Sequence, residues 1–444
     1  MKLFFRGVLL LAIAAFIGES LELVINIVLA RELGEQGLGL YMSILPTIML
    51  IAVLASMELP ISISKFVAEK DKRYHRSMLL HAIGIASFIA ILFLALAMIV
   101  VPHIPVFELY HPYVKILVYI LIPIISFSSV FRGYFMGSQQ MGKIAISNFI
   151  RRALQLVLLV IVYQLFQFEH EIALLVALCT LIASEFVVFA YMATMFFIQL
   201  RSERLEEHAT LNGDTVRKGL LAVSLPMTGV RIFHSVTFAV KPFLIKYALV
   251  NAGLTETMAT AQFGKLAGVA FSIGFFPAFI AHSLLIVLIP TVAEAYAKQD
   301  YLKLQNLLIQ VMKLTLAYGL PSVLIFYFFA EPLTGLFFKD SPAVVYLQLL
   351  VPYFLFHFFV IPLQAYLIGL GLVKDALMHA VWSTFISFLL MYFLGSNPNL
   401  QMHGIIIGMN TGVVLLTLMH YMTVCHKIGI PLSLRLPSIT NIYR

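Results

Sequence analysis

The stretch KGLLAVSLPMTGVRIFHSVTFAVKP, residues 218–242, is a long apolar run that carries cations in its interior. Arg231 follows Gly219 by roughly 18 Å of helix, near the middle of a hydrocarbon layer about 30 Å thick. His234 lies one turn further on nearly the same face, and Lys241 lies near the far end. A charge at that depth costs about 2.5–3.5 kcal/mol, so Arg231 should face other helices or a water-filled cavity. A purely structural ion pair is the alternative.

The composition excludes a water-soluble globule. Hydrophobic residues make up 61% of the 444 and charged residues 11%, whereas soluble domains are about 45–50% apolar. The apolar segments are too long for barrel strands, so the predicted fold is all-α and polytopic. Twelve spans are expected, at about 7–30, 38–60, 78–101, 115–136, 144–166, 172–199, 219–241, 263–290, 307–330, 344–369, 376–395 and 403–425.

Lysine and arginine are distributed unevenly between alternate connectors. One set of connectors holds 22 of the 29, and the other holds Arg31, Lys115, Lys246, Lys265 and Lys339. Loops rich in lysine and arginine stay in the cytoplasm, so both termini are predicted there. The net charge of +8 is therefore a topology signal and does not indicate a nucleic-acid partner.

The two halves of the chain repeat. The hydrophilic stretch 201–218 follows the sixth span and is predicted to be a cytoplasmic linker between an N-terminal lobe, 1–200, and a C-terminal lobe with a short basic tail, 219–444. Six spans in each half predict parallel repeats around a central cavity, with spans one and seven beside it. The matching segments are Arg6-Gly7 with Lys218-Gly219, Pro60–Phe66 with Pro290–Tyr296, and Arg132–Gly137 with Gln364–Gly369.

The repeat suggests a partner for Arg231. Glu19 follows Gly7 at the same spacing by which Arg231 follows Gly219, so symmetry-related helices place both side chains at one depth. We expect an ion pair or a close approach between the lobes. Glu22 shares the face of Glu19 and is expected to reach His234. A gate or binding element and a structural strut are both open interpretations.

Further arginines cluster near the predicted cytoplasmic side. Arg151 and Arg152 lie early in span five, and with Arg132 and Lys143 they would form a mouth that attracts phosphate. Adjacent residues point about 100° apart on a helix, so at most one of the two arginines should line a cavity. Anchoring in the cytoplasmic leaflet is the alternative, because long side chains snorkel to the interface.

Several ionisable residues fall inside other predicted spans. Glu185 and His357 are candidates for ion coupling, and His282 and His379 are further proton or cation candidates. The alternative for each histidine is a simple hydrogen bond between helices. Neither a metal constellation, a Walker A motif nor a nucleophile elbow occurs, so no cofactor is expected and a transporter is favoured over an enzyme.

Six segments resemble the stage V sporulation protein B group of polysaccharide and lipid-linked oligosaccharide flippases, in the superfamily that also holds the multidrug and toxic compound extruders. They are LARELGEQGLGLYM (29–42), LPISISKFVAEK (59–70), RGYFMGSQQMGK (132–143), SLPMTGVR (224–231), QFGKLAGVAF (262–271) and IPTVAEAYAKQD (289–300). The resemblance implies two six-helix lobes, alternating access, and movement of a lipid-anchored glycan across the bacterial cytoplasmic membrane without ATP hydrolysis.

The sequence departs from the group in ways that concern the substrate. Members typically have two spans more than are predicted here, and that last pair is thought to help hold the lipid tail. Relatives tend to carry arginines in span one, where this chain has Glu19 and Asn26, and often an acid at the position of Lys241. An anion clamp of span-one arginines is therefore not expected.

The leading hypothesis is a flippase for a lipid-linked glycan precursor or related anionic amphiphile in envelope or spore polymer synthesis. Its expected partners are that substrate, membrane lipids and envelope-synthesis enzymes, with no nucleic acid. A cation- or proton-coupled exporter of small organic molecules is one alternative, and a non-transporting membrane scaffold is another. The candidate cavity residues are Arg231, Arg152, Arg151, Arg132, Glu19, Glu22, Asn26, His234 and Lys241.

Overall fold

A computed structural model describes residues 2–202, 213–338 and 343–432. These residues form helices and turns, and they contain no strand, which confirms the predicted all-α class. Most of the predicted linker 201–218, the connector residue Lys339 and the end of the basic tail lie outside the described residues.

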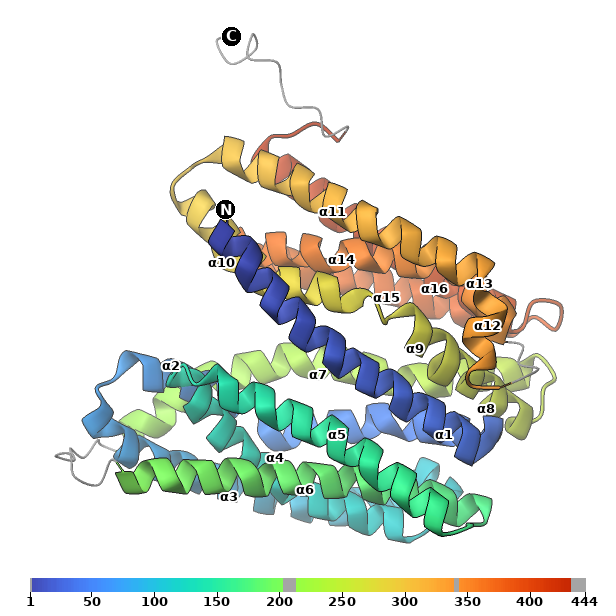
Figure 1. The fold of residues 1–444 in the computed structure, drawn as a ribbon, viewed down its shortest axis with the longest axis horizontal. Helices are drawn as coiled ribbons and strands as arrows, with labels where there is room; N and C mark the ends of the chain where they lie inside the picture. The colour runs from blue at the N-terminus through green and yellow to red at the C-terminus, as the bar shows by residue number, and fades with distance from the viewer. Residues whose placement is uncertain (1, 203–212, 339–342, 433–444) are drawn as a thin grey trace. The chain divides into compact units, whose positions relative to one another are not determined.

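The helices follow one another through short connections (Figure 1). In chain order they are α1 Lys2–Ser56, α2 Leu59–Glu69, α3 Lys72–Val100, η1 Val101–His103, η2 Pro105–Leu109, α4 Tyr113–Gly137, α5 Met141–Leu165, α6 His170–Ser202, α7 Gly213–Asn251, α8 Glu256–Gly264, η4 Lys265–Ala270, α9 Phe271–Gly274, α10 Ala278–Ala297, α11 Tyr301–Phe328, α12 Ala330–Gly335, α13 Ala343–Leu349, α14 Val351–Gly369, α15 Val373–Gly395 and α16 Met402–Ile428.

Within the described residues, 11 helical runs are long and apolar enough to cross a membrane. One of them, Ala15–Glu69, has 55 residues, and a helix of that length would extend about 80 Å, far more than one crossing needs. Its backbone leaves helical geometry at Gly34, with φ 67° and ψ −178°. The run therefore holds two spans, which correspond to the predicted spans 7–30 and 38–60.

The predicted span 263–290 is not one continuous helix. It is divided into α8, the π-helical turn η4, α9 and α10. The break after α9 coincides with Pro277, which cannot donate a backbone hydrogen bond. A Cβ on Gly274 would lie 2.0 Å from the ring of Phe354 on α14, so only glycine permits this close approach. Hydropathy predicted the apolar run but not its interruption.

The chain divides into two compact units. The C-terminal unit comprises Met1–Arg31 and Lys241–Arg444, and the N-terminal unit comprises Glu32–Val240. The division passes through α1 and α7, so the first span packs with the C-terminal helices. Phe16 of α1, for example, meets Phe276 and Phe279 at ring-centroid distances of 5.7 and 5.4 Å. The lobe boundaries 1–200 and 219–444 stay a prediction.

The core of the N-terminal unit forms where α4 packs against α2, α3 and α6. Gly133 and Gly137 of α4 make the contact with α2 possible, because a Cβ at Gly137 would lie 2.6 Å from the Ser64 carbonyl oxygen. Ser126 of α4 also donates a hydrogen bond to the Ala55 carbonyl, at 2.9 Å. Helix α4 therefore contacts both the end of α1 and the start of α2, and it stabilises the connection between them.

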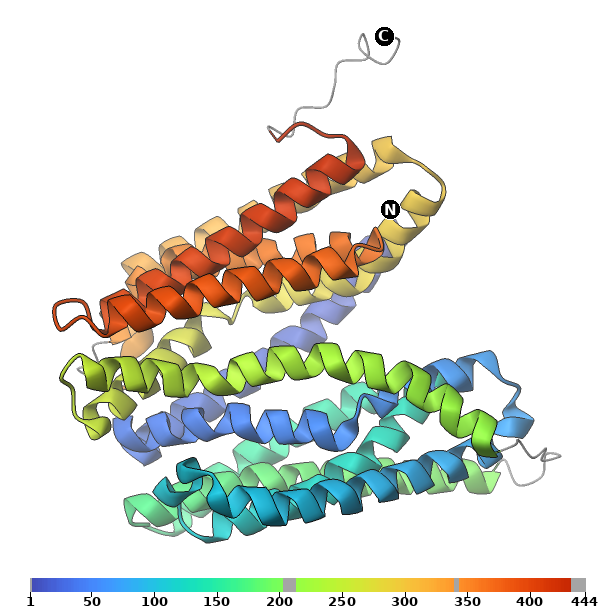
Figure 2. The ribbon, with the colours of Figure 1, turned by 180° about the vertical axis from the view of Figure 1, so that it is seen from behind.

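The core of the C-terminal unit forms around α10, α11, α14 and α16. Helices α15 and α16 run side by side (Figure 2). Gly404, Gly408 and Gly412 lie along their contact, and a Cβ on Gly404 would lie 2.2 Å from the Leu394 carbonyl oxygen. This glycine face therefore lets the two helices pack closely.

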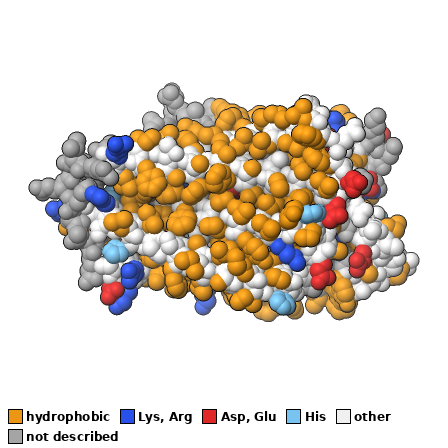
Figure 3. Space-filling model, turned by 90° about the horizontal axis from the view of Figure 1, so that it is seen from below, with side chains coloured by type: hydrophobic (Ala, Val, Ile, Leu, Met, Phe, Trp, Pro, Cys, Tyr) orange, Lys and Arg blue, Asp and Glu red, His pale blue; other side chains and the backbone are white. Residues whose placement is uncertain are grey.

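Large apolar side chains cover much of the molecular surface. Ile91, Leu165 and Phe328 are among the most exposed, at 70%, 69% and 72%. Figure 3 shows one such face, with apolar side chains along its length and most charged side chains toward its two ends. Such a surface suits lipid around the middle and water at the ends.

Candidate functional site

Arg231 of α7 forms an ion pair inside the N-terminal unit. Its Nε lies 3.0 Å from Oε1 of Glu58, whose side chain is only 9% exposed, while the Arg231 side chain is 61% exposed. Glu58 thus neutralises the inner side of the guanidinium. With 61% of its side chain exposed, Arg231 remains accessible within the described part of the unit. A guanidinium held in this way can still present a fork of donors to an anion.

Glu58 lies at a break in helical geometry near the end of the second span. Met57 and Glu58 have left-handed backbone conformations, with φ 42° and 48°, between the end of α1 and the start of α2. Leu59 and Pro60 then begin α2, in whose first turn a proline removes no helical hydrogen bond. Left-handed conformations of non-glycine residues are strained and often occur at functional sites. The local sequence therefore turns a carboxylate into the interior of the unit.

The predicted partners of Arg231 and His234 belong to the other unit. Glu19 and Glu22 lie on the part of α1 that packs with the C-terminal helices, so their approach to Arg231 and His234 stays a prediction. His234 is exposed on α7, one turn after Arg231. The structure adds Glu58, which sequence reasoning missed. Its signal was a single acid near the end of the apolar run 38–60.

A second charged cluster joins three helices of the N-terminal unit. Arg151 Nε of α5 lies 3.6 Å from Glu185 Oε1 of α6, and both side chains are about one quarter exposed, at 26% and 23%. Arg132 of α4 interacts electrostatically with both of them and donates a hydrogen bond from Nη2 to Asn148 Oδ1, at 3.2 Å. The structure thus brings together three predicted residues, two cations and one acid.

The other basic residues expected at this mouth have different surroundings. Lys143 donates to Gln199 Oε1 at 2.9 Å and lies 4.5 Å from the centre of the Phe135 ring. Arg152 is half-buried and has an interaction partner. Because Glu185 offsets one cation, the Arg132–Arg151 cluster keeps an excess of positive charge. The roles of all these residues in binding or coupling stay predictions.

Lys241 begins the part of α7 that belongs to the C-terminal unit. Its ammonium lies 5.6 Å from the centre of the Phe271 ring and 5.8 Å from that of Tyr353. Among the side chains that the structure describes, no carboxylate lies within ion-pair distance of it. The cation is therefore stabilised by aromatic faces and not by an acid.

Aromatic residues extend this environment around His357. Its ring is stacked on Tyr353 of α14, at 5.9 Å and 10°, and meets Phe275 edge-on at 4.9 Å. Phe271 and Phe275 come from α9 and the turn after it, which the break in the eighth span places against α14. Sequence reasoning found Lys241 and His357 but not the three aromatic side chains between them.

The first span contributes polar groups to the same unit. Asn26 Nδ2 donates to Ser272 Oγ of α9, at 3.1 Å, and Ser272 Oγ donates to the Gly268 carbonyl of η4, at 2.7 Å. Glu19 interacts electrostatically with His282 of α10. Thus Asn26, Glu19 and Lys241 all belong to the C-terminal unit, and the described side chains around Lys241 are aromatic.

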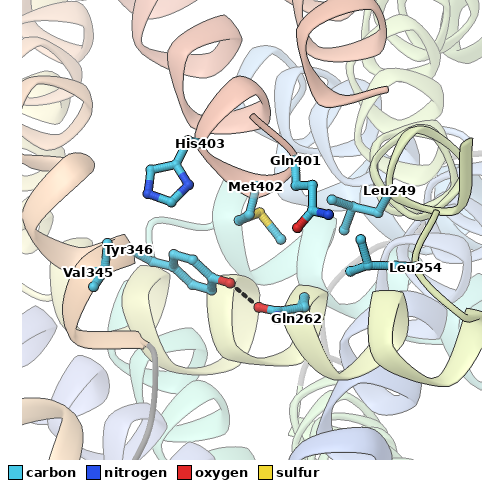
Figure 4. A pocket seen from close by; sticks show the side chains of 8 residues that line it. All are labelled: Leu249, Leu254, Gln262, Val345, Tyr346, Gln401, Met402 and His403. Carbon is cyan, nitrogen blue, oxygen red and sulfur yellow. Dashed lines mark hydrogen bonds between the residues drawn. The ribbon is translucent and has the colours of Figure 1, made fainter. Parts of the chain in front are cut away.

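A separate pocket of about 250 Å³ lies near the loop between α15 and α16 (Figure 4). The Tyr346 hydroxyl donates a hydrogen bond to Gln262 Oε1, and Gln401 and His403 line the pocket from the start of α16. Its described lining contains neutral polar and apolar side chains and no acid, lysine or arginine. It is chemically distinct from the charged positions predicted from the sequence.

Comparisons with known proteins agree with this architecture. Residues 4–253 match the polysaccharide biosynthesis protein family, and residues 257–394 match the MatE family. The chain is 52% identical over 434 residues to sporulation protein YkvU of Bacillus subtilis (strain 168), and this alignment covers 98% of each chain. It is 31% identical to stage V sporulation protein B of the same organism, over 97% of this chain and 85% of that protein.

Solved structures share the fold. An inward-facing multidrug resistance MATE family transporter of the MOP superfamily aligns with a TM-score of 0.67 and 19% identity, over 94% of this chain and 98% of that one. A MOP superfamily transporter from Pyrococcus furiosus aligns with a TM-score of 0.66 and 18% identity, over 97% of both. The chain thus shares its fold with these transporters, and it belongs to the polysaccharide biosynthesis protein family, with sporulation proteins among its relatives.

Proposed function

We propose that this transporter moves a lipid-linked glycan precursor, or a related anionic amphiphile, across the bacterial cytoplasmic membrane by alternating access, for envelope or spore polymer synthesis. The observation that supports it most is Lys241, a cation within a membrane span that faces Phe271 and Tyr353 instead of a carboxylate. A phosphate or pyrophosphate group would supply the missing negative charge.

The surroundings of Lys241 suit the rest of such a molecule. Phe271, Phe275 and Tyr353 offer flat apolar surfaces against which a sugar ring or an acyl segment can pack. Asn26 and Ser272 are hydrogen-bonded to one another nearby on the same unit and offer polar atoms for hydroxyl groups. A cation, aromatic faces and neutral polar groups together match a headgroup with phosphate and sugar parts.

Arg231 would act differently. Its Nε is already occupied by Glu58, so an approaching phosphate meets only the outer part of the guanidinium. The pair has little net charge, which favours a transient contact over tight binding. A transporter must release its substrate, and a weak second contact serves that need. The family match to polysaccharide biosynthesis proteins and the sporulation relatives support the same substrate class.

The test is headgroup translocation in proteoliposomes. The probe is a fluorescent glycan on a polyprenyl pyrophosphate, and access of a membrane-impermeant quencher reports which leaflet holds it. Wild-type protein should move the probe between leaflets, and Lys241→Ala should slow it about tenfold or more, equivalent to about 1.4 kcal/mol. Lys246→Ala is the matched control, because Lys246 lies on the same helix over the ring of Phe243, at 5.2 Å.

Two outcomes would count against the proposal. Wild-type rates no higher than those of empty liposomes would contradict lipid-linked transport, and equal rates in Lys241→Ala and wild type would contradict the anion site. Efflux of organic cations that depends on a proton gradient would instead support the exporter alternative. An unchanged cellular phenotype in cavity variants, with loss on changes to 201–218, would support the scaffold alternative.

A further inference from the structure

Two histidines of the C-terminal unit form a direct hydrogen bond inside the membrane region. Nδ1 of His379 on α15 lies 2.9 Å from Nδ1 of His420 on α16, and the ring centres are 5.1 Å apart. His420 is only 2% exposed. Nε2 of His379 lies 3.4 Å from Oγ1 of Thr423, a hydroxyl that can donate or accept. Neither histidine belongs to the candidate substrate site.

The distance between the two Nδ1 atoms limits how many protons can lie between the two rings. A separation of 2.9 Å fits one N–H donor facing one lone pair. If both Nδ1 atoms carried protons, two N–H groups would face each other and repel. The contact as it stands therefore holds one proton between the two Nδ1 atoms. A single added proton can go to a free Nε2, but protonation of both rings would place two N–H groups in the contact and force the rings apart.

The helices around the pair determine which one can move. Helix α16 has many buried residues and is anchored to α11 near its end, where Gln305 Nε2 donates to the Ile428 carbonyl at 2.9 Å. Helix α15 has few buried residues. The glycine face of α16 holds the far end of α15, from Ser383 to Gly395. Separation of the histidines would therefore move the His379 end of α15.

Other titratable groups near the pair already have their own partners. Asp375, one turn before His379 on α15, is an exposed acid whose charge reaches His379. On α16, Tyr421 and Cys425 interact with one another, and Lys427 lies over the Tyr296 ring of α10. The titratable groups of the neighbouring helices include Tyr301 and Lys303 of α11, Tyr346 of α13, and Tyr353, His357 and Tyr366 of α14.

We propose that His379 and His420 form a proton-binding site in which protonation of both rings breaks their hydrogen bond and moves the start of α15 away from α16. On the predicted topology this end of the hairpin faces the cytoplasm. The site would let cytoplasmic pH, or a coupled proton, change the packing of the C-terminal unit. It does not depend on the identity of the substrate.

The experiment measures the distance between the two helices in the full-length protein. Spin labels are placed at Met378 and Met422, which are exposed on α15 and α16 at 44% and 54%, after replacement of Cys179 and Cys425. Electron–electron resonance should show a longer distance at pH 3.5 than at pH 8, a range that extends well below the usual histidine pKa of about 6.5 because burial disfavours a charged ring. The change should be reversible.

Variants then separate the pair from other titrating groups. His379→Asn with His420→Asn keeps amide groups that can hydrogen-bond but cannot take up a proton, so its distance should not depend on pH. His403→Asn, an exposed position on the same helix α16, is the control and should respond as the wild type does. Equal distances at both pH values in the wild type, or a wild-type response in the double variant, would overturn the proposal.

The single tryptophan gives a second readout without labels. Trp382 is the only tryptophan in the sequence and follows His379 by one turn, so the two side chains are neighbours on α15. Its emission should change reversibly between pH 8 and pH 3.5 in wild type and His403→Asn. The same change in the double asparagine variant would contradict the assignment.

Discussion

Two of the cations on helix α7, Arg231 and Lys241, belong to different units and have opposite surroundings. In the N-terminal unit, Arg231 is paired with the nearly buried carboxylate of Glu58, at 3.0 Å. In the C-terminal unit, Lys241 meets the faces of Phe271 and Tyr353. A paired cation contributes to the stability of its unit, whereas a cation that lacks an acid is available to an incoming anion. On the proposed function, Arg231 would contribute mainly to structure and Lys241 mainly to binding.

The largest expected effect is a loss of stability when the Arg231–Glu58 ion pair is removed. Arg231→Ala should lower the stability of the protein by about 2–3 kcal/mol, because Glu58 is left as a buried carboxylate without its partner. The partial exposure of Arg231 keeps the loss below that of a fully buried pair. Thermal unfolding in detergent measures it. Arg231→Ala with Glu58→Gln should recover most of the loss, and a double variant no more stable than the single one would contradict the assignment.

The next effect concerns the packing that shapes the Lys241 environment. Gly274→Ala should destabilise the C-terminal unit by about 1–3 kcal/mol, because its Cβ would overlap the ring of Phe354. Gly253→Ala is not a suitable control, since Gly253 has a φ of 93°. Gly335→Ala is suitable, because a Cβ there meets no atom within 4 Å. Equal unfolding temperatures for Gly274→Ala and Gly335→Ala would show that this contact is unimportant.

A smaller effect tests the aromatic side of the Lys241 site. Tyr353→Leu keeps an apolar side chain but removes one ring face from the ammonium, a contribution of about 0.5–1 kcal/mol. Affinity for the lipid-linked probe should fall about two- to fivefold, measured by fluorescence titration of the purified protein. Tyr247→Leu, on an exposed part of α7, should leave it unchanged. A loss of the same size in both variants would point to a general effect of tyrosine removal.

The smallest expected effect is a change of stability when the left-handed backbone before Glu58 is relieved of strain. Met57→Gly removes a side chain from a residue with φ 42°, a conformation that glycine adopts without steric cost. The N-terminal unit should gain up to about 1 kcal/mol of stability, offset in part by the greater freedom of glycine in the unfolded chain. A clear loss of stability would show that the Met57 side chain matters more than its backbone strain.

Two kinds of feature that a membrane imposes could be predicted from the sequence, the apolar spans and the charged residues within them. Long apolar runs predicted the spans, and the cost of burying charge singled out Arg231 and Lys241 as candidate site residues. Arg151 was predicted at a cytoplasmic mouth or as a leaflet anchor, and Glu185 within a span, but their pairing depends on which faces of α5 and α6 meet. Hydropathy carries no such information.

The partners of these residues depended on local breaks. Glu58 reaches Arg231 only because the chain leaves helical geometry at Met57 and Glu58, beside Pro60. The aromatic faces around Lys241 depend on the π-helical turn and break that divide the predicted span 263–290. An average over a hydrophobic window hides such breaks, although the prolines and glycines that accompany them are visible in the sequence.

The central claim is that Lys241 binds the negative charge of the substrate, and equilibrium binding tests it most directly. Purified wild type, Lys241→Ala and Lys246→Ala would be titrated with the fluorescent polyprenyl-pyrophosphate glycan and, separately, with the same lipid lacking phosphate. The account predicts that wild type and Lys246→Ala prefer the pyrophosphate lipid by about tenfold or more, and that Lys241→Ala loses this preference. An undiminished preference in Lys241→Ala would contradict it.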